Sequence, residues 1–263
     1  MGGGGWEHFE FRVGPGGHRA LRDKRVRRAL AYGIDRVALA RAIPGDDRFL
    51  LDNTIHLGSE PNYRPNWNEY RYRPAESRRL LEQAGCRRGA DGIYSCAGER
   101  LSLRFVTTAG VELRRQALEL VGAQLRQAGV EVQPVYVPNV VLFDTLLPSG
   151  DFDVALFSYV KLAPDEVFIP YRCGAGYNPS GYCSRLLTAD IDQLGRIVDP
   201  ARRAAVANRI DRRLAAAVPA LPLYQFPHTY VVRKGLNGVV PNGYSVLVGG
   251  GSVWNAENWW LDR

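Results

Sequence analysis

The sequence is almost free of lysine. Its 34 basic residues include only Lys24, Lys161 and Lys234, and all the others are arginine. The arginines are scattered among acidic residues and form no long block of one charge, although the net charge is +7. This distribution indicates solvated helix faces, whereas proteins that bind nucleic acids usually concentrate basic charge in one strip. We therefore expect no nucleic-acid partner.

Long hydrophobic runs are also missing. The longest ones, such as residues 135–137 and 154–157, have the length of a strand and fall far short of the ~20 residues that a membrane-spanning helix needs. Hydrophobic residues make up 46% and charged residues 23% of the 263 residues, as in ordinary globular proteins. The chain is therefore expected to fold into one large or two modest domains.

Three common catalytic motifs are absent, namely G-x-S-x-G, H-E-x-x-H and G-x-x-x-x-G-K-[ST]. The strongest catalytic candidate is the pair Asp151 and Asp153, which share one face of an expected strand. A secreted hydrolase built on this pair would lose its turnover on the substitution Asp153→Asn. Two acids at the start of a strand are more often solvated, so we expect no catalytic residue and no cofactor.

Cysteine is scarce, and the four cysteines form two local pairs, each ten residues apart: Cys86 with Cys96, and Cys173 with Cys183. Each pair brackets glycines and other turn formers, so the chain can reverse and bring the sulfurs together. Closing a loop of this length stabilises a fold by about 2.5 to 3 kcal/mol. Lasting disulfides form in oxidising compartments, which predicts a location outside the cytoplasm.

The alternative to disulfides is a zinc site. The sequence contains no C-x-x-C, and the four histidines, His8, His18, His56 and His228, lie far apart without the spacing of metal ligands. No metal ligand is therefore expected.

The pattern of hydrophobic residues predicts an α/β fold. Residues 101–107 alternate as a strand, residues 113–129 follow a helical period, and residues 130–137 read as a second strand. A strand, a helix and a strand within about forty residues form a crossover unit, which requires a parallel strand pair covered by helices. One helical pattern runs from Asp23 to the stop at Pro44, and further strands are expected at 152–159, 221–226 and 229–232.

One string resembles a known family. Residues 23–36, DKRVRRALAYGIDR, resemble the D-x-R-V-R-x-A-L-x-x-A-I-D-R signature of the family 5 extracellular solute-binding proteins, the receptors of peptide, opine and nickel ABC importers. Residues 75–85 resemble the family's A-x-x-L-L-x-x-A-G helix, and Phe152-Asp153 matches its F-D strand. Later strings follow in the family's order at 178–183, 199–202, 219–224 and 254–255.

The resemblance implies the second lobe of a two-lobed, hinge-closing receptor of the periplasmic-binding-protein class II type. Such a receptor captures a solute at the extracellular face of the membrane or in the periplasm and delivers it to an ABC permease. The expected organisation is a cloning scar or truncation joint at 1–5, a strand returning to a missing first lobe at 6–22, the solute-binding lobe at 23–241 and a C-terminal return segment at 242–263. The full-length protein is expected to carry a lipid anchor, and the isolated lobe to form a homo-oligomer.

The resemblance also directs attention to two loops that face the solute in the family. It predicts ligand contacts from Tyr159, Lys161, Asn178 and Tyr182, with a structural alternative in which Tyr182 packs beside the disulfide and Asn178 caps a turn. Dipeptide and oligopeptide receptors of the family place an acidic residue in the first loop, where this chain has Lys161. A lysine there favours an anionic or polar group of the solute. Nickel is disfavoured because no histidines cluster.

A second binding hypothesis stays open at this point. The net charge of +7 is also compatible with a basic secreted domain that binds a nucleic acid or a cell-wall polymer. Such a domain would lose affinity steeply as the salt concentration rises.

Overall fold

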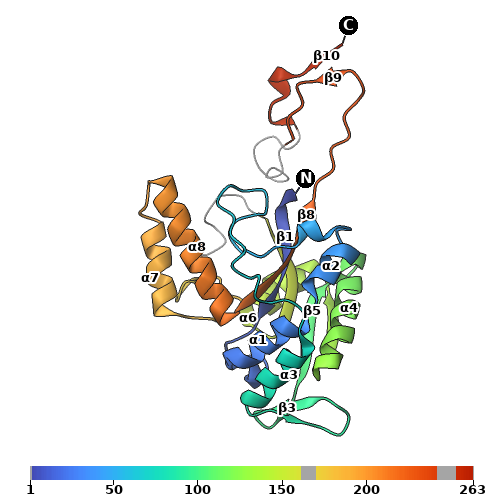
Figure 1. Cartoon of the computed structure of the whole chain (residues 1–263), viewed down its shortest axis with the longest axis vertical. Coiled ribbons are helices and arrows are strands. Elements are labelled where there is room, and N and C mark those ends of the chain that lie inside the picture. Colours follow the sequence, from blue (N-terminus) through green and yellow to red (C-terminus); the bar gives the residue numbers. More distant parts are fainter. Residues whose placement is uncertain (1, 161–169, 242–252, 263) are drawn as a thin grey trace.

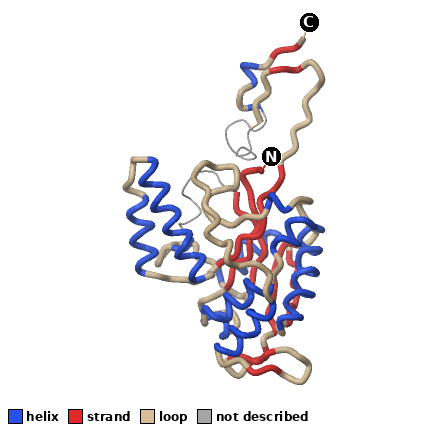
Figure 2. Tube along the Cα trace, in the orientation of Figure 1, coloured by secondary structure: helices blue, strands red, loops and turns tan. Residues whose placement is uncertain are grey.

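A mixed five-stranded sheet runs through the middle of the protein (Figures 1 and 2). The structure is a computed structural model and describes residues 2–160, 170–241 and 253–262. From one edge of the sheet to the other, the strands are β6 (Glu131–Val137), β5 (Ser102–Thr108), β7 (Val154–Val160), β1 (Gly2–Phe11) and β8 (Ala220–Pro227). β5 is parallel to β6 and β7, and β1 is antiparallel to both of its neighbours. The predicted α/β fold with a mixed sheet is confirmed.

The predicted crossover unit consists of β5, α4 (Glu112–Ala128) and β6. α4 ends at Gly129, whose φ of +87° lies in the left-handed region that favours glycine. A side chain at this position would also meet the ring of Tyr94, because a Cβ atom would lie 2.5 Å from it. The glycine therefore lets the chain turn directly from the helix into the second parallel strand.

Helices cover both faces of the sheet. On one face, a core that includes Phe9, Leu30 and Phe105 packs under α1 (Lys24–Gly33), α3 (Pro74–Gln83) and α4. On the other face, Val106, Phe157 and Leu142 form a smaller core under the short run α5 (Asn139–Val141), η3 (Leu142–Leu146) and α6 (Leu147–Ser149). α7 (Arg185–Leu194) and α8 (Pro200–Ala217) lie side by side next to the sheet (Figure 1).

The single helix expected from Asp23 onward is in fact two helices, α1 and α2 (Arg36–Ala42). Asp23 caps α1 by accepting the Arg25 backbone N–H at 2.8 Å. Asp35 then starts α2 by accepting the Ala38 backbone N–H at 2.9 Å. The hydrophobic residues keep a helical period across the break between the two helices, so the pattern did not reveal the break. In the structure, the break is marked by Asp35, which caps the second helix.

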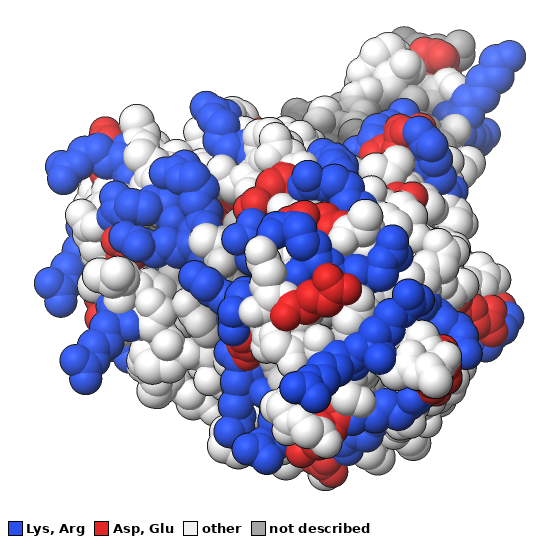
Figure 3. Space-filling model, turned by 60° about the horizontal axis from the view of Figure 1, so that its bottom comes forward, with Lys and Arg blue, Asp and Glu red and all other residues white. Residues whose placement is uncertain are grey.

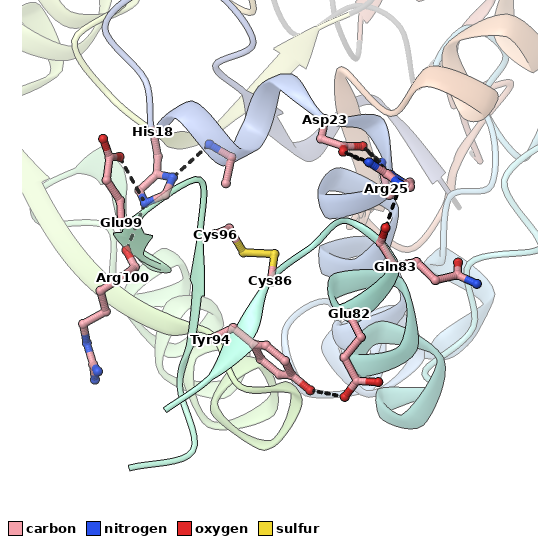
Figure 4. The surroundings of a disulfide bond; sticks show 11 residues. His18, Asp23, Arg25, Glu82, Gln83, Cys86, Tyr94, Cys96, Glu99 and Arg100 are labelled. Atoms are coloured by element: carbon pink, nitrogen blue, oxygen red, sulfur yellow. Dashed lines mark hydrogen bonds and ion pairs between the residues drawn. A yellow bond between two sulfur atoms is a disulfide. The ribbon is translucent and has the colours of Figure 1, made fainter. Parts of the chain in front are cut away.

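Both predicted disulfides are present. Cys86–Cys96 links the residues after α3 to β3 (Tyr94–Cys96), the middle strand of a small sheet with β2 (Arg87–Arg88) and β4 (Glu99–Arg100). Figure 4 shows Tyr94 beside this disulfide, with its hydroxyl donating to Glu82 Oε1 at 2.8 Å. Cys173–Cys183 closes the second loop. Each crosslink closes a short local loop, and the contact from Tyr94 to Glu82 attaches the first of these loops to α3.

The expected segment boundaries compare with the structure as follows. Residues 2–5 lie inside β1, and residues 6–11 complete it as an inner strand between β7 and β8. Near the other end, β9 (Leu236–Asn237) pairs with β10 (Trp260–Leu261) in a small unit that projects from the body (Figure 1). No strand forms at 229–232.

In the described part of the chain, no helix has the length and apolar character needed to span a membrane.

Candidate functional site

One edge of the sheet gathers most of the polar and aromatic side chains that could contact a ligand. β5, β6, β7 and β8 end at this edge, and β1 begins there, near the N label in Figure 1. We call it the carboxyl edge. In open α/β sheets, ligands bind just outside the carboxyl ends of the parallel strands, because loops and helix N-termini meet there.

A buried ion pair lies at the carboxyl edge between Glu7 on β1 and Arg114 in the first turn of α4. The two side chains are 2.8 Å apart, and Glu7 is only 3% exposed. Arg114 also donates to Thr108 Oγ1 at 2.5 Å and to Ser158 Oγ at 3.1 Å. The guanidinium therefore ties β1, β5 and β7 to α4 at this edge.

The carboxylate of Glu7 is used asymmetrically. Oε1 accepts both contacts from Arg114, at 2.9 Å from Nε and 2.8 Å from Nη2. Oε2 is buried and accepts no hydrogen bond from the residues that the structure describes. Burial raises the pKa of Glu7, and the charge of Arg114 acts in the opposite direction.

A cavity of about 390 Å³ adjoins this ion pair. Its walls come from the residues after α2, the turn between β5 and α4, the start of α5 and the end of β8. Most of the lining side chains are apolar; the full lining is Glu7, Ile43, Pro44, Thr108, Ala109, Val111, Leu113, Arg114, Asn139, Tyr224, Phe226 and Pro227. The volume lies within the range of small-molecule sites, about 300 to 1,000 Å³.

The predicted site residue Tyr159 lies at the carboxyl edge, on the opposite face of the sheet from Glu7. Its ring stacks on His8 with centroids 4.5 Å apart and an angle of 9° between the planes, and it also contacts Trp6. Within the described part of the chain, the buried hydroxyl of Tyr159 has no hydrogen-bond partner, and burial raises its pKa well above the usual value. Nearby, Tyr171 donates to Glu10 Oε2 at 2.9 Å.

Two other predicted site residues, Asn178 and Tyr182, lie toward the other end of β1. Asn178 and Tyr182 belong to a loop whose Ser180 carbonyl accepts the Val13 N–H at 2.7 Å, beyond the far end of β1. Tyr159 pairs with Trp6, so the two places are about 20 Å apart along the strand. The antiparallel pairing of β1 with β7 therefore places Asn178 and Tyr182 toward the other end of β1 from Tyr159, and a ligand site shared by these residues stays a prediction. Lys161 lies outside the described residues.

The side chain of Asn178 has the structural role that was the alternative hypothesis. Its Oδ1 accepts the Gly181 N–H at 2.9 Å, and its Nδ2 donates to the Tyr182 carbonyl at 2.9 Å. Tyr182 is half-buried against the main core. These contacts support a turn-forming role for the pair, and a ligand contact by either residue remains a prediction.

Asp151 and Asp153, the acidic pair considered for a hydrolase, form hydrogen bonds and an ion pair with neighbouring segments. Asp153 is 5% exposed and accepts the backbone N–H groups of His18 at 2.8 Å and Arg104 at 2.7 Å. Asp151 forms an ion pair with the Arg104 side chain at 2.8 Å. Both acids therefore help to join neighbouring segments. Among the described residues, no group of three or more histidines, cysteines and acids is placed to hold a metal ion.

Basic side chains dominate the face drawn in Figure 3, with acidic side chains in smaller groups among them. Asp190 on α7 accepts from Arg209 at 3.0 Å and from Arg213 at 2.6 Å, both on α8. On α3, Arg79 pairs with Glu76 at 2.6 Å. These pairs agree with the interpretation of the arginines as parts of solvated helix faces.

Glu7 and Arg114 were not among the residues predicted from the sequence. One signal was available for Arg114: it lies three residues before Ala117 and four before Leu118, on the buried stripe of α4. An arginine on an apolar stripe needs a buried partner. The sequence does not identify that partner, because Glu7 is 107 residues away.

Comparisons with known proteins agree with the fold. The family model for bacterial extracellular solute-binding proteins, family 5 Middle, matches residues 2–180. The oligopeptide-binding protein OppA of Mycobacterium tuberculosis (strain H37Rv) is 29% identical over 247 residues, which cover 92% of this chain and 41% of OppA. The oligopeptide-binding protein AppA of Bacillus subtilis is 24% identical over 260 residues, which cover 92% of this chain and 45% of AppA.

Two solved structures share the fold. AppA of Bacillus subtilis in complex with a nonapeptide has a TM-score of 0.78 and 20% identity, and the match covers 100% of this chain and 52% of AppA. The oligopeptide-binding protein of Thermus thermophilus with a pentapeptide has a TM-score of 0.79 and 25% identity, covering 99% of this chain and 48% of that protein. The chain thus spans about half the length of these relatives.

Proposed function

The chain belongs to the bacterial extracellular solute-binding proteins of family 5, and we propose that it forms one lobe of a receptor for a peptide or a related small solute. The receptor captures the solute outside the cell membrane and delivers it to the permease of an ABC importer. The relatives in the comparisons include oligopeptide-binding proteins, and one solved relative holds a nonapeptide.

Two observations together support the proposal. Candidate ligand-contacting groups lie at the carboxyl edge, and the chain covers only about half of each relative. The match to about half of each relative leaves room for a second lobe. The cavity beside Glu7 and the aromatic cluster of Trp6, His8 and Tyr159 both lie at one edge of the sheet. A second lobe closing over this edge would bury a solute between two walls.

The proposal has further parts that concern organisation, location and chemistry. Residues 23–241 together with β1 form the lobe, and residues 242–263 lead toward the other lobe. The receptor is lipid-anchored at the extracellular face or free in the periplasm. It changes no bond of its solute and needs no cofactor, and its ligand contacts include Tyr159 and Lys161.

The experiment compares this chain with a longer form that includes the segment matching the first half of the relatives. Both are incubated with a mixture of three- to nine-residue peptides, and the retained peptides are identified by mass spectrometry. Calorimetry with one retained peptide then measures the affinity. We expect the longer form to bind and the chain alone to bind at least about 100-fold more weakly, because one wall supplies only part of the contacts.

Three results would contradict the proposal. Retention of no peptide by the longer form argues against a peptide receptor. Equal affinity of the two forms argues against a site between two lobes. Shortened peptides recovered after the incubation reveal an enzyme.

A further inference from the structure

We propose that the end of the molecule around β3 binds a polymer of the cell envelope whose charges are phosphodiester groups. We call this end the basic end. β5, β6 and β7 begin there, so the length of β5, about 20 Å, separates it from the carboxyl edge. A second lobe that closes over the carboxyl edge leaves the basic end uncovered. The inference goes beyond solute binding, and only the location of the polymer outside the cell rests on the proposed function.

The first argument is a group of basic side chains without acidic partners. Figure 3 brings forward the lower part of Figure 1, where β3 lies, and basic side chains dominate the face that it draws. These side chains come from η1 (Arg19–Arg22), the start of α1, β2 and the last turn of α4. Six of them are exposed and form no ion pair with any residue that the structure describes: Arg19, Arg22, Lys24, Arg87, Arg88 and Arg126.

Contacts between the segments place these six residues at one end of the molecule. Nε2 of His18, the residue before η1, lies 2.9 Å from the carbonyl oxygen of Arg100 on β4 (Figure 4). The backbone N–H of Tyr94 on β3 donates to the carbonyl of Gly129, directly after α4, at 2.8 Å. The small sheet of β2, β3 and β4 therefore joins η1 on one side to the end of α4 on the other.

The acidic residues of the basic end already have partners. Their contacts are Asp23 with Arg25, Asp91 and Glu131 with Arg100, Glu99 with His18, and Glu82 with Tyr94. The charges of the six unpaired residues are therefore not neutralised by a neighbouring carboxylate. Basic groups gathered on one face attract anions from solution.

The chemistry of the basic groups favours a phosphate polymer. Five of the six residues are arginine, whose guanidinium offers two parallel N–H groups to two oxygens of one phosphate. A single exposed contact of this kind is weak. A chain with a phosphodiester in every repeat makes several contacts at once, and it releases its bound counterions when it binds. A polymer therefore suits this surface better than a single small anion.

One observation favours a polymer over an anionic membrane surface. Segments that lie on membranes bury apolar side chains at the lipid boundary in addition to their electrostatic contacts. The described residues of the basic end expose no large hydrophobic side chain. Contact at this end is therefore electrostatic, as expected for a hydrated polyanion.

The test measures the binding of fluorescently labelled poly(glycerol phosphate) to the chain by fluorescence anisotropy. Dextran of similar length is the neutral control, and single-stranded DNA is a phosphodiester polymer of another class. Vesicles of phosphatidylglycerol and phosphatidylcholine, compared at equal phosphate concentration by co-sedimentation, present the membrane. We expect poly(glycerol phosphate) to bind most tightly, and its affinity to fall at least about tenfold between 50 and 200 mM salt.

Matched variants assign the binding to the basic end. Arg87→Gln combined with Arg88→Gln removes two unpaired charges and should weaken binding at least about fivefold. Arg202→Gln combined with Arg212→Gln makes the same change in net charge on α8, where both arginines are exposed and form no ion pair with a described residue. This control should change the affinity less than about twofold. If the first variant does not fold, Arg126→Gln, in the last turn of α4, should weaken binding at least about twofold.

The inference is overturned if dextran binds as tightly as poly(glycerol phosphate). It is also overturned if both double variants lose the same affinity, because net charge alone then explains the binding. Tighter binding to the vesicles assigns the basic end to a membrane, and tighter binding to DNA assigns it to a nucleic acid; either result removes the envelope polymer.

The outcome is separate from that of the peptide-capture experiment, which concerns the carboxyl edge. Captured peptides without polymer binding leave the receptor proposal standing and remove only this inference. Polymer binding without captured peptides leaves the basic end assigned and removes the receptor.

Discussion

At the scale of single residues, buried arginines hold distant segments together. Arg36 is 2% exposed and donates to the carbonyls of Leu51, Pro222, Trp67 and Tyr70 and to the carboxylate of Asp52. Arg27 donates to four backbone carbonyls, at 2.6 to 3.1 Å, at the ends of η1 (Arg19–Arg22) and α8. Burial lowers its pKa to about 10. Both arginines belong to the signature string of residues 23–36, so part of that signature serves the fold.

The ion pair of Glu7 and Arg114 gives the first stability prediction. Arg114→Leu leaves the buried Glu7 carboxylate without its cation and should lower the free energy of unfolding at pH 7 by about 3 to 5 kcal/mol. The loss should shrink as the pH falls toward 4, because the unpaired carboxyl has a folded-state pKa above its unfolded value and is stabilising when protonated. Urea unfolding measures both effects.

Two further variants control this experiment. Arg115→Leu changes an exposed arginine on the same turn and should leave the free energy of unfolding nearly unchanged. Glu7→Gln combined with Arg114→Leu should recover part of the loss, because no charge is then left buried. If Arg114→Leu is as stable as the parent, the ion pair of Glu7 and Arg114 contributes little to the free energy of unfolding.

At the scale of elements, α8 anchors the irregular segment between η2 (Asp47–Phe49) and α3. Asp211 of α8 is fully buried and accepts from Thr54 Oγ1 at 2.6 Å and from Trp67 Nε1 at 3.0 Å, with a further contact from Asn66. Burial raises the pKa of Asp211, and these donors act against the shift. One carboxylate thus organises a long segment that has no helix or strand of its own.

The raised pKa of Asp211 predicts a pH dependence. Its folded-state pKa lies above the unfolded value, so its contribution to stability is complete below about pH 4 and declines as the pH rises through the folded-state pKa. Relative to Asp211→Asn, the parent should therefore lose stability as the pH rises above 4. Urea unfolding at one-unit intervals from pH 4 to 7 measures the difference between the two proteins. A difference that stays constant or grows with pH would refute the prediction.

The disulfides predict a stability difference of another kind. Replacing Cys86 and Cys96 together by serine should lower the free energy of unfolding by about 2 to 3 kcal/mol, since the unfolded chain gains the freedom of a ten-residue loop. The pair Cys173 and Cys183 closes a loop of the same length and should cost a similar amount. Denaturant unfolding without reductant tests both variants. Unchanged stability would show that packing around the sulfurs replaces the crosslink.

At the scale of the whole molecule, the small unit that contains β9 and β10 stands apart from the body (Figures 1 and 2). It exposes Trp254, Trp260 and Leu261 by 45%, 58% and 54%. Large apolar groups at such exposure usually contact a partner surface. In the proposed receptor that surface belongs to the other lobe.

The exposed unit predicts how the chain behaves in solution. Sedimentation velocity should show self-association that grows with concentration, because the apolar groups find partners on other copies. A variant that ends at Pro241 should remain folded and sediment as a monomer. A strictly monomeric parent chain at high concentration would contradict this prediction.

Much of the fold followed from local patterns in the sequence. The crossover of β5, α4 and β6 and both disulfides were predicted correctly, because turn formers and hydrophobic periods act between neighbouring residues. The break between α1 and α2 was missed, since the period continued across it. Local patterns also could not show which of the candidate site residues, such as Tyr159, lie close together in space.

The residue sequence alone determined the kind of sheet, the crosslinks and the family, all of which depend on short strings or on their order. The arrangement of the candidate site depended on the three-dimensional fold. Strand pairing put Asn178 and Tyr182 at the opposite end of β1 from Tyr159, and packing joined Glu7 to Arg114 beside a cavity. Contacts between residues a hundred positions apart depend on register and packing, which no local pattern encodes.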